Sequence, residues 1–205
     1  MDKLRDLALQ IETLYEDMSI TFHEYQHRRQ LSCRPGCGKC CLSPNVFTST
    51  LEMLPLAFHL LDTHQAEQTL DQLEQHQENF CVFYRLTSED GAEGFCSAYA
   101  HRPSICRMFG AAGYPDKHGK PGLSTCAVIK ADHPQEYSQT LIAIQQDDPA
   151  PMMKDWRSQI TAISYDLATK DMPINEAAKD ALSRVLLIAS LGYEEINPIL
   201  PAGNG

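Results

Sequence analysis

Residues 33–41 read CRPGCGKCC and place four of the chain's eight cysteines within one short segment. Pro35, Gly36 and Gly38 interrupt regular helix or strand, and gaps of two or three residues let neighbouring thiols converge on one ion. Soft thiolate ligands select zinc, copper(I) or iron–sulfur clusters. We therefore expect an irregular metal-binding region here, with the rest of the chain folded around it.

Four further cysteines follow this cluster along the chain. Consecutive side chains in an extended segment point apart, so Cys40 and Cys41 either serve different centres or include one non-ligand. Eight thiols suffice for two four-cysteine sites, or for one site with thiols to spare. His27, six residues before the cluster, is a further candidate. The predicted metal ligands are Cys33, Cys37, Cys40, Cys41, Cys81, Cys96, Cys106 and Cys126.

The composition limits the classes of partner. A net charge of −10 argues against a nucleic-acid binder and against docking on an anionic membrane surface. Charges recur along the first 18 residues, which lack the apolar core of a signal peptide, and no stretch is long enough to span a membrane. We therefore expect a cytoplasmic protein. Disulfides are rare in that compartment, so metal binding is favoured over a disulfide scaffold.

Four alternative roles suit these cysteines and histidines less well than metal binding. Buried, inert cysteines are common singly but not four together, and sequence cannot single out a catalytic thiol. The spacing of Cys33, Cys37 and Cys40 matches that of radical S-adenosylmethionine enzymes, but a long helix precedes it and no strand–helix alternation follows. Residues 23–27 match the H-E-x-x-H pattern of zinc proteases, yet they lack its context. We interpret His23 and His27 as ordinary residues flanking an apolar helix face.

Hydrophobic periodicity predicts a mainly α-helical fold in a single domain, 1–205. It comprises an N-terminal helix within 1–30, the cysteine region over 33–126 and C-terminal helices within 135–191. Ser49 and Glu52 resemble a capping box, and 80–86 with 95–99 suit one small hairpin. We expect a glycine-containing loop over 110–125 and a frayed tail from Pro198. The individual helices are expected at 4–28, 51–61, 65–77, 135–146, 150–169 and 174–191.

A second motif carries a family resemblance. Residues 95–109 read FCSAYAHRPSICRMF, and with Cys81 and the first cluster they resemble the YkgJ-type cysteine-cluster family, of CxxCxxCC type. The resemblance covers about residues 33–110, and Cys126 lies outside its pattern. It implies chelation of zinc or iron, without one settled activity, and some relatives are linked to protein lysine methylation.

The same segment suggests roles for its polar side chains. Pro103 has a fixed φ and restrains Arg102, which stiffens the approach of Cys106. Arg102 and Arg107 are suited to donate hydrogen bonds to thiolates or cluster sulfides, and Tyr99 either packs against the site or donates to it. The predicted cofactor is an iron–sulfur cluster, with a 4Fe–4S type favoured, or zinc. The alternatives are a metal-dependent enzyme, redox or protein-modifying, and a metal carrier, each with a possible protein partner.

Overall fold

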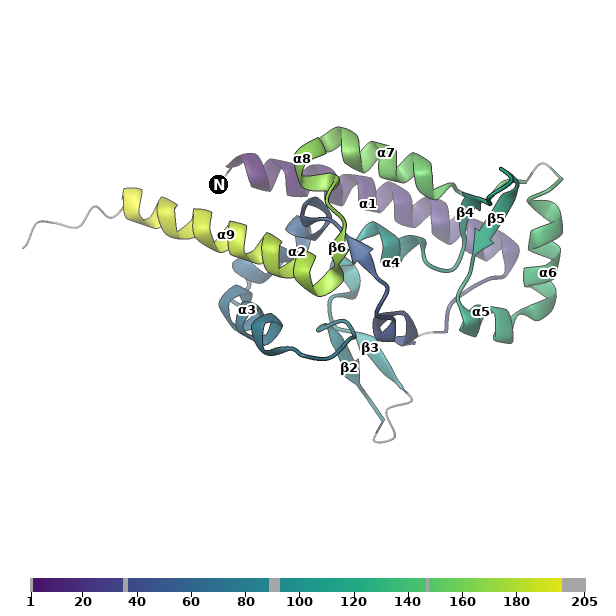
Figure 1. Cartoon of the computed structure of the whole chain (residues 1–205), viewed down its shortest axis with the longest axis horizontal. Coiled ribbons are helices and arrows are strands. Elements are labelled where there is room, and N and C mark those ends of the chain that lie inside the picture. The colour runs from purple at the N-terminus through teal and green to yellow at the C-terminus, as the bar shows by residue number, and fades with distance from the viewer. Residues whose placement is uncertain (1, 35–36, 89–92, 147, 197–205) are drawn as a thin grey trace, which may run out of the picture.

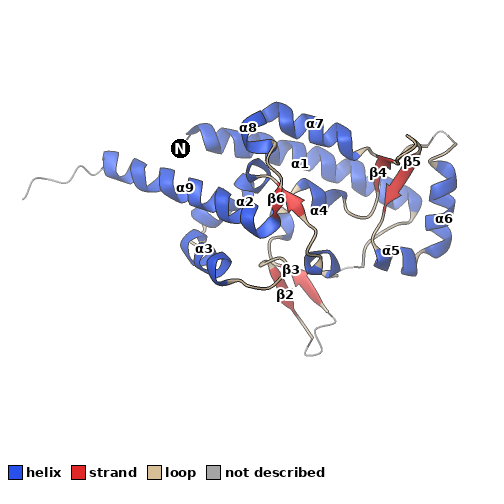
Figure 2. Ribbon diagram, in the orientation of Figure 1, coloured by secondary structure: helices blue, strands red, loops and turns tan. Residues whose placement is uncertain are grey.

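The computed structural model describes residues 2–34, 37–88, 93–146 and 148–196, without the side chains beyond Leu191. It confirms a mainly helical fold in which the strands are short and paired in twos (Figures 1 and 2). No described helix has both the length and the apolarity needed to cross a bilayer. The predicted tail from Pro198 lies outside the described residues.

The N-terminal helix α1 (Asp2–Arg29) confirms the first predicted helix. Its apolar stripe, which includes Ile11, Met18 and Phe22, is buried against the rest of the molecule. The helix ends where Gln30 adopts a positive φ of 55° and the amide of Leu31 donates to the Gln26 carbonyl at 2.9 Å. The chain changes direction at Gln30, and Cys33 lies near the end of α1, where it lines the same cavity as Gln26.

Helix α2 (Thr50–Asp62) is the centre of the helical body. Most of its residues are buried, because α1 packs on one side and α9 (Ile174–Ile196) on another. The Thr50 hydroxyl donates to the Asp180 carboxylate of α9 at 2.6 Å and ties the two helices together. Helix α3 (Ala66–Gln75) also packs against α9.

The helices after the cysteine region differ from the prediction at two points. The expected helix over 150–169 is two helices, α7 (Met153–Ile163) and α8 (Tyr165–Ala168), because Ser164 is extended with φ −156° and ψ 104°. Helix α7 lies along α1 (Figure 1). The remaining pair, of which the first was not predicted, is α5 (Ala127–Asp132) and α6 (Pro134–Ala143).

The strands form three antiparallel pairs within the described residues. The predicted hairpin exists as β2 (Tyr84–Leu86) and β3 (Gly94–Cys96). The segment expected to be a loop over 110–125 is instead a second hairpin, β4 (Ala112–Pro115) with β5 (Pro121–Ser124). The Gly113 amide also donates to the Pro151 carbonyl at 2.8 Å, and Gly113 forms an isolated bridge with Met152, so this hairpin contacts the segment before α7. The third pair joins β1 (Phe47–Thr48) to β6 (Met172–Pro173).

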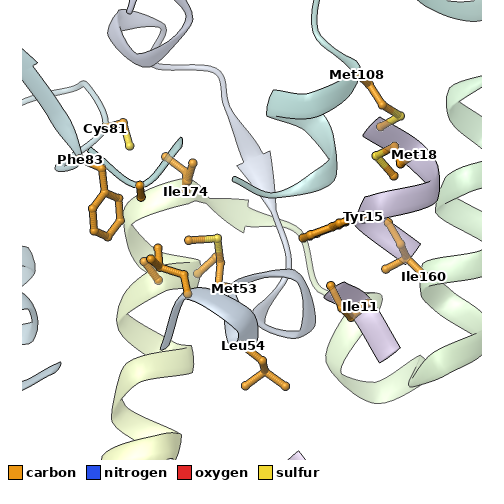
Figure 3. Close-up of a cluster of buried hydrophobic side chains, with 14 of the residues drawn as sticks. Ile11, Tyr15, Met18, Met53, Leu54, Cys81, Phe83, Met108, Ile160 and Ile174 are labelled. Atoms are coloured by element: carbon orange, nitrogen blue, oxygen red, sulfur yellow. The ribbon is translucent and has the colours of Figure 1, made fainter. Parts of the chain in front are cut away.

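Short helical turns carry the remaining cysteine-rich segments. They are the 3-10 helices η1 (Lys39–Leu42) and η2 (Tyr99–His101) and the helix α4 (Ser104–Met108). All three border the core. In Figure 3, Cys81 and Phe83 lie beside Ile174 and Met53, among the buried side chains that fill the space between α2 and α9. The segment around Cys81 and Phe83 therefore packs into the hydrophobic core of the helical body.

Candidate metal centre

Backbone hydrogen bonds bring the first cysteine segment against Cys81 and against the hairpin that carries Cys96. The Cys81 amide donates to the Cys41 carbonyl at 2.9 Å, and the Gly38 amide donates to the Gly94 carbonyl at 2.7 Å. Cys37 also forms an isolated bridge with Gly94. Residues that lie far apart in the sequence thus share one small region.

Gly38 allows this close approach. A Cβ atom on Gly38 would lie 2.4 Å from the Tyr84 ring and 2.7 Å from the Gly94 carbonyl oxygen. Those contacts are far shorter than van der Waals distance, so only glycine fits between the loop and the hairpin. The glycine that follows Cys37 therefore fixes how η1 and its two cysteines meet β3.

Five cysteines form what we call the inner group: Cys40, Cys41, Cys81, Cys96 and Cys106. Cys41 and Cys81 are only 6% and 4% exposed. Hydrogen bonding with the thiols of Cys40, Cys81 and Cys96 raises the pKa of Cys41. All five inner cysteines line one small pocket. Burial raises the pKa of Cys106, and the nearby Cys40, Cys81 and Cys96 thiols add to that rise.

The pKa values within the inner group are shifted in opposite directions: those of Cys40 and Cys96 are lowered, and those of Cys41 and Cys106 are raised. A hydrogen bond from the Cys41 thiol and, less strongly, the charge of Arg102 lower the pKa of Cys40 to about 6, although burial opposes this. A hydrogen bond from the Cys41 thiol, a hydrogen bond with the Ala98 backbone and the charge of Arg102 lower the pKa of Cys96 to about 7, although burial opposes this. Thiolates at Cys40 and Cys96 are therefore stabilised near neutral pH, and thiolates are the form that binds metal.

The other three cysteines, Cys33, Cys37 and Cys126, form what we call the outer group. Cys33 is exposed and the other two are half-buried. Although the residue as a whole is exposed, partial burial of its sulfur atom raises the pKa of Cys33 to about 11, and the Cys37 and Cys126 thiols add to the rise. The Cys126 Sγ accepts a hydrogen bond from the Ile129 amide at 3.3 Å. Cys126 therefore joins the cluster although it lies far from it in the sequence.

A cavity of about 370 Å³ opens between the two groups. Its described lining contains four basic side chains and no acidic one, in a chain with 27 acidic residues. Three of its aromatic side chains are exposed. A basic lining offsets the negative charge that several thiolates would place there. The basic residues are Arg34, Lys39, Arg102 and Arg107, and the exposed aromatic ones are Phe95, Tyr99 and Phe109.

The predicted cofactor-binding residues all line this cavity. Arg102 lies 3.5 Å over the Tyr99 ring, and its Nε donates to the Tyr99 carbonyl at 3.0 Å. Arg107 donates to the Ser19 hydroxyl at 2.8 Å, to the Arg102 carbonyl at 2.8 Å and to the Ala100 carbonyl. Most of the Arg107 hydrogen-bonding capacity is thus used to hold the 99–102 turn on α1.

One buried residue that supports the site was not predicted from the sequence. Glu52, 5% exposed, accepts hydrogen bonds from the Ser104 amide at 3.0 Å and the Ser49 hydroxyl at 3.3 Å. The Tyr15 hydroxyl lies 3.4 Å from the same carboxylate. The capping-box resemblance is only partly correct: Ser49 is the N-cap of α2, but its side chain makes no cap hydrogen bond to the helix and donates to Glu52 instead. The pattern did not indicate the contact of Glu52 with α4, which carries Cys106.

The chemistry of these donors fits a soft metal, but their side chains are not arranged as a metal site. Several thiols, cations and a cavity meet in one place, which suits a thiolate-bound ion or cluster. Among the described residues, however, no three His, Cys, Asp or Glu side chains already have the arrangement of a metal site. His23 and His27 are exposed, with rings 6.4 Å apart, and neither lines the cavity.

A comparison with protein-family models identifies this region. Residues 32–139, more than half of the chain, match the model "CxxCxxCC: Putative zinc- or iron-chelating domain". The match extends past Cys126, which the sequence pattern alone had left out. No curated protein and no solved structure matches the chain. The chain therefore belongs to the CxxCxxCC family of zinc- or iron-chelating domains.

Proposed function

We propose that this protein holds an iron–sulfur cluster through thiolates of the inner group, with zinc as the alternative occupant. The observation that carries the proposal is that Cys40, Cys41, Cys81, Cys96 and Cys106, from segments far apart in the sequence, line one small pocket. Burial of four or more thiols together is unfavourable for thiolates unless a cation binds them. A metal centre accounts for the convergence of these thiols.

An iron–sulfur cluster is favoured over zinc for two reasons. The cavity beside the thiols has room for a group larger than one ion. Its basic lining, Arg34, Lys39, Arg102 and Arg107, suits an anionic cluster with sulfide atoms that accept hydrogen bonds. Four cysteines nevertheless bind zinc equally well by chemistry alone. The loaded inner group would supply electron transfer if it holds a cluster, or structural support if it holds zinc.

A second candidate function is a metal-dependent enzyme that acts on a protein. The cavity leaves space beside the thiols, and Phe95, Tyr99 and Phe109 expose aromatic surface at it. Such a surface is typical of a site that receives a partner. A metal carrier is the third candidate, which differs by fast metal exchange. In each case we propose a cytoplasmic protein that does not bind nucleic acid.

Metal analysis of anaerobically purified protein tests the proposal. We expect stoichiometric iron and acid-labile sulfide with broad visible absorption, or stoichiometric zinc without colour. Replacement of Cys81 or Cys96 by serine should strongly reduce the metal content, while Ser97→Ala, beside Cys96, should not. Protein that contains neither metal after anaerobic handling, and does not take up either one, would refute the proposal.

A further inference from the structure

The cavity beside the cysteines adjoins a second one of about 410 Å³, and we call the two together the groove. The two cavities share five lining residues, among which are Arg34, Lys39 and Phe95. The second cavity lies against the β2–β3 hairpin, where Tyr84 and Glu93 line it. The groove is therefore larger than a single ion requires, and its size suits a segment of peptide.

Positive charge is concentrated in the groove. Its described lining contains Arg34, Lys39, Arg102 and Arg107, and the one acidic residue of that lining is Glu93, in the second cavity. The chain as a whole has a net charge of −10. A basic surface in an acidic protein favours an acidic partner in one orientation, because this part attracts the partner while the rest of the surface repels it.

Two arginines of the groove have no carboxylate partner among the described residues. Of the nine arginines in the sequence, six pair with an aspartate, Arg34 among them, but Arg102 and Arg107 do not. Arg107 donates to a hydroxyl and two carbonyl oxygens, whereas within the described structure Arg102 donates only through Nε, to one backbone carbonyl. The terminal nitrogens of Arg102 and the Nζ of Lys39 can therefore donate to a carboxylate of another molecule.

Exposed aromatic side chains lie beside these cations. Phe95, Tyr99 and Phe109 are 44%, 63% and 39% exposed and come from β3, η2 and the end of α4. The Arg102 guanidinium lies 3.5 Å over the Tyr99 ring. Aromatic and arginine side chains are enriched where proteins bind each other. A small anion would leave these rings exposed, whereas a peptide with apolar side chains between its carboxylates would cover them.

We propose that the groove binds an acidic segment of a partner protein, with carboxylates of the segment at Lys39 and Arg102 and its apolar side chains on the exposed aromatic rings. Arg102 lines both the groove and the small pocket of the inner group, so the bound segment lies beside the thiols. The inference rests on the proposed function only for the metal that the segment meets there. The binding itself uses side chains other than thiols.

Fluorescence anisotropy with a defined peptide tests the proposal on the full chain, purified anaerobically. The probe is a short fluorescein-labelled peptide of alternating glutamate and phenylalanine, and the control peptide has glutamine in place of each glutamate. We expect the acidic peptide to bind at least about tenfold more tightly than the control, and to bind less tightly as salt is added, because charge contributes to recognition. Equal binding of the two peptides, or no binding of the acidic one, overturns the inference.

Two pairs of variants locate the binding. Lys39→Glu should weaken binding of the acidic peptide at least several-fold. Lys154→Glu, at an exposed position of α7 outside the groove, makes the same change of net charge and should leave binding unchanged. Tyr99→Ala should also weaken binding, whereas Tyr165→Ala, which removes a ring that is 69% exposed on α8, should not. Equal effects within either pair would contradict binding at the groove.

Metal content, measured on the same samples, separates this inference from the proposed function. Metal-containing protein that does not bind the acidic peptide overturns the groove and leaves the metal centre, whereas protein without metal that binds the peptide through Lys39 does the reverse. Free glutamate or inorganic phosphate that competes as strongly as unlabelled peptide would overturn the protein partner in favour of a small anion. A natural chain that is dimeric by sedimentation, and monomeric as Lys39→Glu, would overturn it in favour of a second copy.

Discussion

The carboxylate of Glu52, on α2, accepts a hydrogen bond from the backbone amide of Ser104 at the start of α4, at 3.0 Å. Glu52 is buried, and the short helix that it holds carries Cys106 two residues further along. The Glu52 side chain is thus one of the links between the helical body and the cysteine region. A buried amide without an acceptor costs about 1–3 kcal/mol, so this contact contributes to the position of Cys106 as well as to stability.

We predict that Glu52→Ala lowers the free energy of unfolding by about 1–3 kcal/mol and reduces bound metal, because the Ser104 amide loses its acceptor. Glu52→Gln, which keeps an acceptor oxygen, should retain most of the metal. Ser49→Ala is the control, since Ser49 contacts the other Glu52 oxygen and not α4. Metal content and chemical denaturation are measured on each variant. An unchanged metal content and spectrum in Glu52→Ala would show that Glu52 supports the fold alone.

Gly38→Ala should disturb the site by steric overlap. The added Cβ would meet the Tyr84 ring and the Gly94 carbonyl oxygen, so η1 must move away from the hairpin at a cost of about 1–3 kcal/mol. We expect Gly38→Ala to lose more bound metal than Gly119→Ala, even where the two variants lose similar thermal stability. Gly119→Ala, at a positive φ of 77° with open space around it, is the control for backbone strain. Equal metal content in both variants would contradict this role of Gly38.

Arg107 is predicted to act by holding the 99–102 turn against α1. Its guanidinium donates to Ser19 and to two carbonyl oxygens, and it lies 4.6 Å over the Tyr15 ring. Lysine cannot reproduce this planar set of donors. Arg107→Lys should therefore lower the free energy of unfolding by about 1–3 kcal/mol, whereas Arg157→Ala in an exposed ion pair should cost about 0–1 kcal/mol. Urea denaturation measures both, and similar losses would contradict the prediction.

The contact between Thr50 and Asp180 predicts a pH dependence. Burial opposes ionisation of Asp180, but hydrogen bonds from Arg184 and Thr50 outweigh it and lower the pKa below 3.8. A lowered folded-state pKa contributes stability that is present above the unfolded value and lost as pH falls through the folded one. Asp180→Asn should therefore reduce stability by roughly 0.5–1 kcal/mol at pH 7, since the group is partly exposed to solvent.

The difference between natural chain and Asp180→Asn should shrink as pH falls below about 4. Thermal unfolding at a series of pH values measures it. Asp62→Asn provides the comparison, because Arg5 lowers the pKa of Asp62 through a surface ion pair that contributes little stability. A difference for Asp180→Asn that stays constant from pH 7 to acid would contradict the assignment.

The helices were predictable because their sequence signals are local. The apolar spacing of α1 and the continuous apolar run of α2 are present in short windows of sequence. The break at Ser164 was missed because no glycine or proline marks it. The β4–β5 hairpin was missed because its glycines and prolines indicated a loop, whereas the contact of Gly113 with Pro151, distant in sequence, stabilises it as a strand pair.

The sequence predicted which segments form the candidate site, but not which of their residues contact one another. Cysteine spacing indicated thiolate chemistry and identified Arg102 and Arg107 as neighbours. It did not indicate that Cys126 lies with Cys33, nor that Arg34 pairs with Asp132, because both contacts join segments about 100 residues apart. The contact of Glu52 with α4 was also missed. The sequence offered a local explanation for Glu52, a capping box with Ser49, and gave no reason to expect a distant partner.

X-ray absorption spectroscopy of the metal in anaerobically purified protein tests the thiolate metal centre most directly. We predict a first shell of four sulfur ligands, with additional iron–iron scattering for a cluster, or with zinc–sulfur distances of about 2.3 Å for zinc. The same spectrum should lose sulfur ligands in a variant that lacks Cys81. A first shell of nitrogen and oxygen, unchanged when Cys81 is replaced, would contradict a metal centre built from the inner group.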